Sequence, residues 1–178
     1  MKNVLIITSS FRHNSNSSAL AKAFAEGAKS TGNSVETVEL CDKNIAFCKG
    51  CLACQKTGKC VINDDAVTIA EKMLNADVLV FASPVYYYSI SGQLKTMLDR
   101  ANPLYASDYK FRSVFLLSTA ADDDKSAVEG SAKAVQGWVD CFEKAKFECV
   151  VFAGGVDQPG DINGHIAIEK AFKIGANV

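Results

Sequence analysis

The sequence predicts a single α/β domain, residues 1–178, in which helices cover both faces of a doubly wound, five-stranded parallel sheet. Three observations support this fold class. Strand-like and helix-like segments alternate five times along the chain, and most of the strand-like segments are apolar on both faces. The length of 178 residues is that of one ordinary domain with a full hydrophobic core.

The first strand is predicted at Val4–Ile7, a continuous apolar run, and the first helix at Ala19–Lys29, where apolar residues recur at helical spacing. Four more strand and helix pairs follow. The second strand, Val35–Leu40, carries charged residues and suits the rim of the sheet. The pairs are Val35–Leu40 with Val67–Leu74, Val78–Ala82 with Leu94–Ala101, Val114–Leu117 with Ala127–Lys144, and Cys149–Phe152 with Ile166–Ile174.

Composition and charge exclude several classes of protein. Hydrophobic residues make up 48% of the chain and charged residues 22%, which argues against disorder. The net charge is -1 without a basic cluster, so we expect no nucleic-acid partner. The apolar run near the N-terminus is too short for a signal peptide or a membrane span, so we expect a cytoplasmic protein with no membrane partner. Seven cysteines in a reducing compartment indicate metal binding or redox chemistry.

The loops that follow the strands are the expected place for a binding site. Right-handed crossovers bring these loops to one edge of the sheet, where open α/β sheets bind their ligands. The second loop is unusually long for a compact domain, which indicates a function. The five loops are Thr8–Ser18, Cys41–Asp65, Ser83–Gly92, Ser118–Ser126 and Ala153–His165.

The first loop, Thr8–Ser18, is a candidate phosphate site. It has neither glycine-rich phosphate motif of the dinucleotide-binding or P-loop proteins. Its hydroxyl and amide groups, the free N–H groups of the next helix and the guanidinium of Arg12 could together hold a phosphate. The alternative is a solvated turn in which Ser17 or Ser18 only caps the helix. The position of the loop, after the first strand, favours phosphate.

Two stretches of the chain resemble the NADPH-dependent FMN reductase family of flavodoxin-like proteins, and the likeness spans nearly the whole chain. They are Ser10-x-Arg12-x-Asn14-x-Asn16-Ser17 and the run Ser83–Lys95, which begins Ser-Pro-Val-Tyr-Tyr-Tyr. The resemblance implies a flavodoxin-like sheet with strand order 2-1-3-4-5, FMN as cofactor and NAD(P)H as hydride donor. By position, it implies a phosphate site at Ser10, Arg12, Asn16, Ser17 and Ser18, and a ring site at Pro84, Val85, Tyr86 and Tyr87.

The chain departs from the family pattern in two loops. Ser9 and Phe11 stand within a segment that in the family often reads Gly-Ser-Pro-Arg. A glycine commonly follows the fourth strand, where this chain has Thr119, Ala120, Ala121 and Asp122, which we still expect to contact the cofactor.

A flavin ring needs a flat apolar wall and nearby N–H groups, and the segment from Pro84 to Tyr88 could supply both. Three consecutive tyrosines cannot all face one ring. We expect Tyr86 and Tyr87 near the flavin and Tyr88 in packing contacts.

Four cysteines lie close together in the long second loop, as Cys48-x2-Cys51-x2-Cys54-x5-Cys60. The first three have the spacing that winds a chain around a cubane iron-sulfur cluster, although a ferredoxin would continue differently. Zinc sites more often use two separated cysteine pairs. The spacing resembles the iron-sulfur flavoprotein branch of the same family, which implies a four-iron cluster. Alternatives are thiols that simply pack, or a redox sensor that uses Cys48 and Cys51.

The remaining candidates have structural explanations. We expect Cys141 and Cys149 in the core and find no partner for Cys41. Both histidines, His13 and His165, are expected at the surface or as loop caps. The acidic run from 122 to 124 is expected to cap a helix rather than to bind magnesium. Trp138 is expected in the core or at a subunit contact.

These features predict an FMN-dependent oxidoreductase that takes hydride from NAD(P)H. Its acceptor would be a quinone, a flavin, a nitro or azo compound, or a one-electron redox protein. The alternatives are a flavodoxin-type or iron-sulfur electron carrier, and a redox-responsive regulator without turnover. The resemblance also implies a homodimer or a tetramer, in which a neighbouring subunit helps to cover the flavin.

Overall fold

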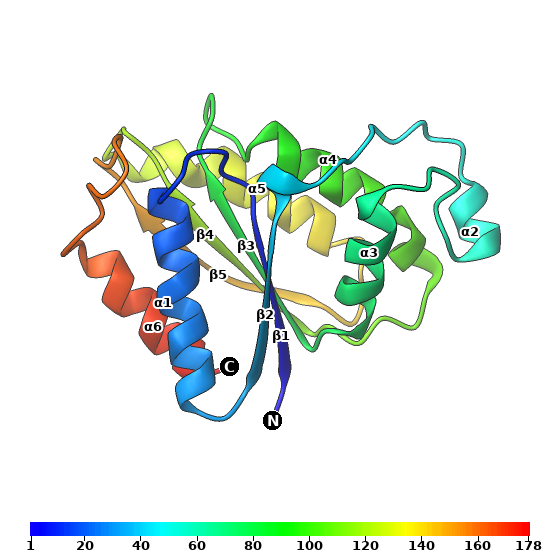
Figure 1. Cartoon of the computed structure of the whole chain (residues 1–178), viewed down its shortest axis with the longest axis horizontal. Helices are drawn as coiled ribbons and strands as arrows, with labels where there is room; N and C mark the ends of the chain where they lie inside the picture. Colours follow the sequence, from blue (N-terminus) through cyan, green and yellow to red (C-terminus); the bar gives the residue numbers. More distant parts are fainter.

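The computed structural model describes residues 1–178 and contains one parallel sheet with the strand order β2-β1-β3-β4-β5 (Figure 1). This is the predicted order. All four strand pairs are parallel, so every strand ends at the same edge of the sheet. The strands are β1 (Asn3–Thr8), β2 (Ser34–Glu39), β3 (Val78–Pro84), β4 (Ser113–Thr119) and β5 (Lys146–Ala153).

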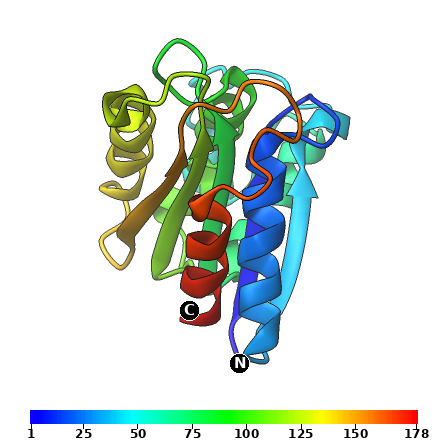
Figure 2. The ribbon, with the colours of Figure 1, turned by 90° about the vertical axis from the view of Figure 1, so that its left-hand side faces the viewer.

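Helices cover both faces of the sheet, as predicted. Helices α1 and α6 lie side by side on one face, and α3, α4 and α5 pack on the other (Figures 1 and 2). None of the helices combines the length and hydropathy of a membrane span. The helices are α1 (Asn16–Ser30), α2 (Ala53–Thr57), α3 (Asp65–Asn75), α4 (Gly92–Arg100), α5 (Glu129–Val139) and α6 (Ile166–Ala176), with 3-10 helices η1 (Leu40–Asp42), η2 (Asn102–Ala106) and η3 (Lys125–Val128).

The apolar runs of the central strands supply two separate cores. Successive side chains of a strand point to opposite faces, so Val4 and Ile6 pack beneath α1 and α6, whereas Leu5 and Ile7 pack on the opposite side. Trp138 packs against the second of these cores, edge-on to Phe81, as expected for a packing residue. Burial on both faces explains why these strands are continuously apolar.

The ends of several elements differ from the sequence prediction. Helix α5 ends at Val139 instead of Lys144, because the chain turns and inserts Phe142 into the core before it enters β5. Cys141 therefore lies in an exposed turn and not in the core. Cys149 is only half-buried, because β5 is an edge strand with one open side. The charged strand β2 is the other edge, as predicted.

Side-chain caps set the starts of three helices. Helix α1 starts at Asn16 because Ser15, rather than Ser17 or Ser18, caps it by accepting the N–H of Ser18. His165 caps α6 through Nδ1, and Asp124 caps η3, so both have the capping role predicted for them.

Helices α1 and α6 pack closely because each presents a glycine to the other. A Cβ atom on Gly27 would lie 2.1 Å from the carbonyl oxygen of Phe172, and one on Gly175 would lie 2.1 Å from that of Phe24. No real Cβ contact is this short, so the two backbones must separate if either glycine gains a side chain.

We expect Gly27→Ala to destabilise the protein by about 1–3 kcal/mol, because overpacking outweighs the higher helix propensity of alanine. The control is Gly137→Ala in α5, where a Cβ atom meets nothing within 4 Å. This control should be neutral or more stable by up to about 1 kcal/mol. Urea unfolding followed by the fluorescence of Trp138 measures both effects. Equal stabilities of the two variants would contradict the packing argument.

Candidate functional site

A cleft opens at the edge where the strands end. The loops after β1, β3, β4 and β5 form its walls and enclose a volume of about 220 Å³. This edge is the expected place for a ligand in an open α/β sheet. The cleft is lined by Ser10, Arg12, Ser15, Asn16, Ser17, Pro84, Val85, Tyr86, Thr119, Ala120, Ala121, Val156, Asp157 and Pro159.

One end of the cleft is formed by the N-terminus of α1. The N–H groups of Asn16 and Ser17 have no acceptor in the chain, and the hydroxyls of Ser10 and Ser15 lie beside them. The helix dipole adds a partial positive charge at this position. Free N–H donors, hydroxyls and positive potential together make an anion-binding site.

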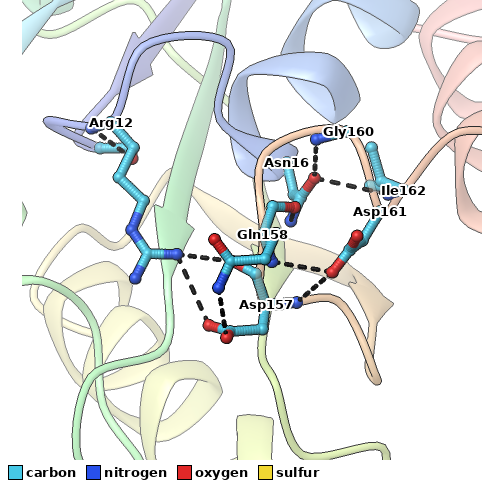
Figure 3. A network of polar contacts seen from close by, with 8 residues as sticks. Arg12, Asn16, Asp157, Gln158, Gly160, Asp161 and Ile162 are labelled. Atoms are coloured by element: carbon cyan, nitrogen blue, oxygen red, sulfur yellow. Dashed lines mark hydrogen bonds and ion pairs between the residues drawn. The ribbon is translucent and has the colours of Figure 1, made fainter.

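Arg12 spans the cleft and contacts the loop after β5 (Figure 3). Its Nη1 atom donates a hydrogen bond of 2.5 Å to the carbonyl oxygen of Asp157 and lies 3.6 Å from the Asp157 carboxylate. Both side chains are more than half exposed, so this ion pair is weak and solvent-screened. The guanidinium is therefore present at the predicted phosphate site and is free to change partners.

The side chain of Asn16 connects two loops of the cleft. Its Oδ1 atom accepts the N–H groups of Gly160 and Ile162 at 3.1 and 3.4 Å, and its Nδ2 atom donates to the carbonyl of Gln158 at 2.9 Å (Figure 3). The side chain thus ties the loop after β5 to the start of α1. Its backbone N–H remains available to an anion, so a contact between Asn16 and the phosphate stays a prediction for this group.

Buried hydroxyls hold the loop after β3 against the loop after β1. Ser91 donates from Oγ to Ser9 Oγ at 2.8 Å, and its N–H donates to Ser83 Oγ at 2.9 Å. Ser118 Oγ donates to the carbonyl of Ser83 at 2.8 Å. All four serines are completely buried, so this network has little freedom to shift. The network fixes the walls of the cleft relative to each other.

The tip of the loop after β3 is a strained turn. Tyr87 and Tyr88 both have positive φ angles, 48° and 61°, and Tyr86 and Ser89 exchange two backbone hydrogen bonds across them. Tyr86 lines the cleft, but Tyr87 is fully exposed and does not. Tyr88 is 61% exposed and is not packed in this chain, contrary to expectation.

Two backbone donors of the predicted ring wall are bonded within the chain, whereas the N–H groups of Tyr87 and Tyr88 have no acceptor. The N–H of Val85 donates to the carbonyl of Thr119, and that of Tyr86 to Ser89, so neither is free. The free N–H groups in these two loops include those of Ala121 and Asp122, after β4.

Most of the predicted cofactor residues come together. Ser18, Tyr87 and Asp122 do not line the cleft. Residues of the loop after β5 were missed. This loop was expected at the same edge, but no charge or hydroxyl pattern singled it out. The missed lining residues are Ser15, Val156, Asp157 and Pro159.

The four cysteines of the second loop surround a separate, small cavity beside the end of α4. Its walls include Cys48, Cys51, Cys54 and Cys60 together with Arg100 and Asn102. The short helix α2, which the sequence did not predict, turns Cys54 inward, where Asn102 Nδ2 donates to its sulfur at 3.0 Å. The N–H of Gly50 donates to the sulfur of Cys48 at 3.4 Å.

The four thiols are spread around this cavity. No three His, Cys, Asp or Glu side chains converge closely enough to bind one ion. In a four-iron cluster each thiolate binds a different iron atom, so the four ligands lie farther apart, and N–H donors to sulfur are typical. The cavity is only about 20 Å³, so the loop would have to open to hold such a cluster.

An ion pair between Arg100 and Asp64 lies at the base of the cysteine loop. The guanidinium is completely buried and forms two hydrogen bonds of 2.7 and 2.8 Å with the carboxylate. Burial alone would raise the pKa of Asp64, but Arg100 and the N–H groups of Ala46 and Ala66 outweigh it and hold this pKa below its usual value.

The chain matches a known family over most of its length. The sequence description of the NADPH-dependent FMN reductase family matches residues 2–145. An iron-sulfur flavoprotein of Methanocaldococcus jannaschii is 38% identical over 57% of this chain and 52% of that protein. One from Methanosarcina thermophila is 36% identical over 60% of this chain and 56% of that protein. The chain therefore spans about half the length of these curated relatives.

Solved structures share the fold. An NAD(P)H:quinone oxidoreductase from Methanothermobacter marburgensis superposes with a TM-score of 0.76 at 20% identity, covering 99% of this chain and 95% of that one. An azoreductase from Bacillus anthracis has the same TM-score and identity and covers both chains completely. At such low identity these likenesses show the flavodoxin-like fold alone.

Stability should depend on pH through Asp64. A carboxyl whose folded pKa is lowered contributes stability that is present above its unfolded pKa, about 3.9, and is lost as the pH falls through the folded value. We expect Asp64→Asn to cost about 3 kcal/mol at pH 7, because it leaves Arg100 buried without a counter-ion. The difference from the wild type should shrink below about pH 4.

Urea unfolding at several pH values measures this dependence. Asp108→Asn is the control, because Lys144 also lowers the pKa of Asp108 but that pair is exposed and should matter much less. A constant difference between wild type and Asp64→Asn from pH 7 to pH 3 would contradict the assignment.

Proposed function

The chain belongs to the NADPH-dependent FMN reductase family, and from this premise we propose that it is an FMN-dependent oxidoreductase that takes hydride from NAD(P)H. The observation that carries the proposal is the cleft where β1, β3 and β4 end, with an anion site at one end and an apolar wall at the other. The anion site suits the phosphate of FMN, and the apolar wall suits its ring.

The phosphate is proposed to bind at the start of α1. The free N–H groups of Asn16 and Ser17 and the hydroxyls of Ser10 and Ser15 would donate hydrogen bonds to it. Arg12 would leave Asp157 and contribute the one full positive charge, because a charge-assisted bond to phosphate is stronger than its exposed ion pair.

The ring is proposed to lie against Pro84, Val85 and Tyr86, which provide an apolar and aromatic surface. The free N–H groups of Ala121 and Asp122 lie in the adjacent loop and could donate to the polar edge of the ring. Bound FMN would supply the redox chemistry by accepting hydride and passing its electrons to a second substrate. The protein residues bind and orient the cofactor and exclude water from its inner face.

The second substrate is proposed to be a small-molecule acceptor such as a quinone, a flavin, or a nitro or azo compound. Exposed aromatic side chains lie in the loops after β1 and β3 that form the cleft: Phe11, Tyr86, Tyr87 and Tyr88. Exposed apolar rims of this kind are typical of protein contacts, which favours a homodimer or a tetramer. We propose that the protein acts in the cytoplasm, where thiols stay reduced.

We also propose that the four-cysteine loop binds a four-iron cluster, with one iron held by each of Cys48, Cys51, Cys54 and Cys60. Two observations favour this: all four thiols border one cavity, and two of the sulfurs accept N–H donors. The names of the relatives that share 36–38% identity point the same way. A cluster would let the protein serve a one-electron redox partner.

We expect the purified chain to bind FMN and Arg12→Ala to bind it about 10- to 100-fold more weakly, the loss expected for one bond between charged groups. Quenching of FMN fluorescence measures both affinities. Arg112→Ala is the control, because Arg112 bonds only carbonyls of its own segment, far from the cleft. A chain that ignores added FMN would eliminate the proposed cofactor.

The same preparation separates an enzyme from an electron carrier. Addition of NADPH or NADH alone should bleach the flavin absorbance, and a quinone should restore it over many cycles. Bleaching that requires a helper reductase would favour the carrier. A single stoichiometric reduction without turnover would favour the redox-responsive regulator.

Anaerobic purification should yield about four iron atoms and four sulfides per chain. Cys54→Ala should lose most of this iron, whereas the control Cys141→Ala, in the exposed turn after α5, should keep it. Wild-type protein that is yellow and active but free of iron and sulfide would eliminate the cluster and leave a plain FMN reductase.

A further inference from the structure

Arg100 is the largest completely buried side chain of the protein, and it lies in the wall of the cysteine cavity at the end of α4. A buried guanidinium is costly unless every donor is satisfied. Nothing in the cleft of the proposed flavin site contacts it. The position of this residue therefore requires an explanation of its own.

Four of its five N–H donors have oxygen partners. Nη1 donates to the carbonyl of Ala46 and to Asp64, each at 2.7 Å, and Nη2 donates to the carbonyl of Ile62 at 3.0 Å and to Asp64 at 2.8 Å. The fifth donor, Nε, is buried without any hydrogen-bond partner. An unsatisfied buried donor destabilises the folded state, so natural proteins rarely keep one.

The partners of Arg100 mark the two ends of the cysteine loop. Ala46 precedes Cys48 by two residues, and Ile62 follows Cys60 by two. Asp64 completes the closure, because its Oδ2 atom also accepts the N–H of Ala46 at 2.9 Å. One side chain thus joins the start and the end of the segment that carries all four cysteines.

Two donors from the end of α4 and its continuation belong to the same cavity wall. Asn102 already donates to the sulfur of Cys54. Cys60 and Arg100 line the same cavity of only about 20 Å³, so the thiol and the guanidinium are close neighbours.

We propose that Arg100 is the positioning residue of the four-cysteine site: it closes the base of the loop and supplies its free Nε–H, with the amide of Asn102, to the sulfur atoms there. The closure of the loop does not depend on a cluster. Only the donation to sulfur rests on the cluster proposed above. A positive charge and N–H donors beside cluster sulfurs stabilise the reduced form, so they raise the reduction potential.

The test compares Arg100→Lys with the matched control Arg112→Lys, both as anaerobically prepared full-length protein. Lysine keeps the charge but lacks the planar fork that joins Ala46, Ile62 and Asp64. We expect backbone hydrogen exchange in residues 46–62 to become at least tenfold faster in Arg100→Lys. Its cluster midpoint potential should become more negative. Neither quantity should change in Arg112→Lys.

A second variant covers the case in which Arg100→Lys does not fold. In the double variant Arg100→Met/Asp64→Asn no charge remains buried, and asparagine can still cap α3 as Asp64 does. It should unfold as a single cooperative transition yet show the same faster exchange in residues 46–62 and the same change in potential. A folded variant with wild-type exchange and potential overturns the proposal.

The same measurements distinguish a failure of the proposed role of Arg100 from a failure of the proposed cluster. Wild-type protein that takes up no iron overturns the cluster. Hydrogen exchange on those iron-free chains then decides alone whether Arg100 closes the loop, and unchanged exchange in Arg100→Lys overturns that role.

Discussion

The in-register parallel pairing of β1, β3 and β4 is the constraint on which the rest of the structure depends. Pro84 pairs with Thr119, so β3 and β4 end together, and Thr8 pairs with Ala82, so β1 ends two residues before them at the same edge. Each connection that leaves this edge contributes one wall of the cleft. Residues more than 140 positions apart, such as Arg12 and Asp157, become neighbours only because of this alignment.

Helix α4 connects the two candidate sites. At its N-terminus, Ser91 caps the helix and joins the buried hydroxyl network of the cleft. At its other end, Arg100 closes the cysteine loop. Nine residues of helix span roughly 14 Å, so a rigid and well-anchored element sets the separation between the cleft and the cysteines.

Much of the architecture follows from local sequence, and the finer site contacts do not. Apolar runs such as Val4–Ile7 identify strands because burial on both faces leaves no room for polar residues. Cysteine spacing likewise predicted which four thiols share one cavity. In contrast, the tether formed by Asn16 and the closure formed by Arg100 depend on partners 36 to 146 residues away, which no local pattern encodes. The exposure of Cys141 could not be predicted either, because it follows from the end of α5 at Val139 and the burial of Phe142 in the core.

The turn at Tyr87 and Tyr88 stores conformational energy at the rim of the cleft. Two adjacent left-handed residues are usually Asn-Gly, and each bulky residue in that region costs about 1–2 kcal/mol. Gly130 accommodates the turn, because its missing side chain leaves room for the carbonyl oxygen of Tyr88. A strained turn gives up little favourable backbone energy when it changes conformation, whereas the unstrained segments around it would give up more. The lip of the cleft is therefore where the molecule can reshape itself around an arriving planar ligand most cheaply.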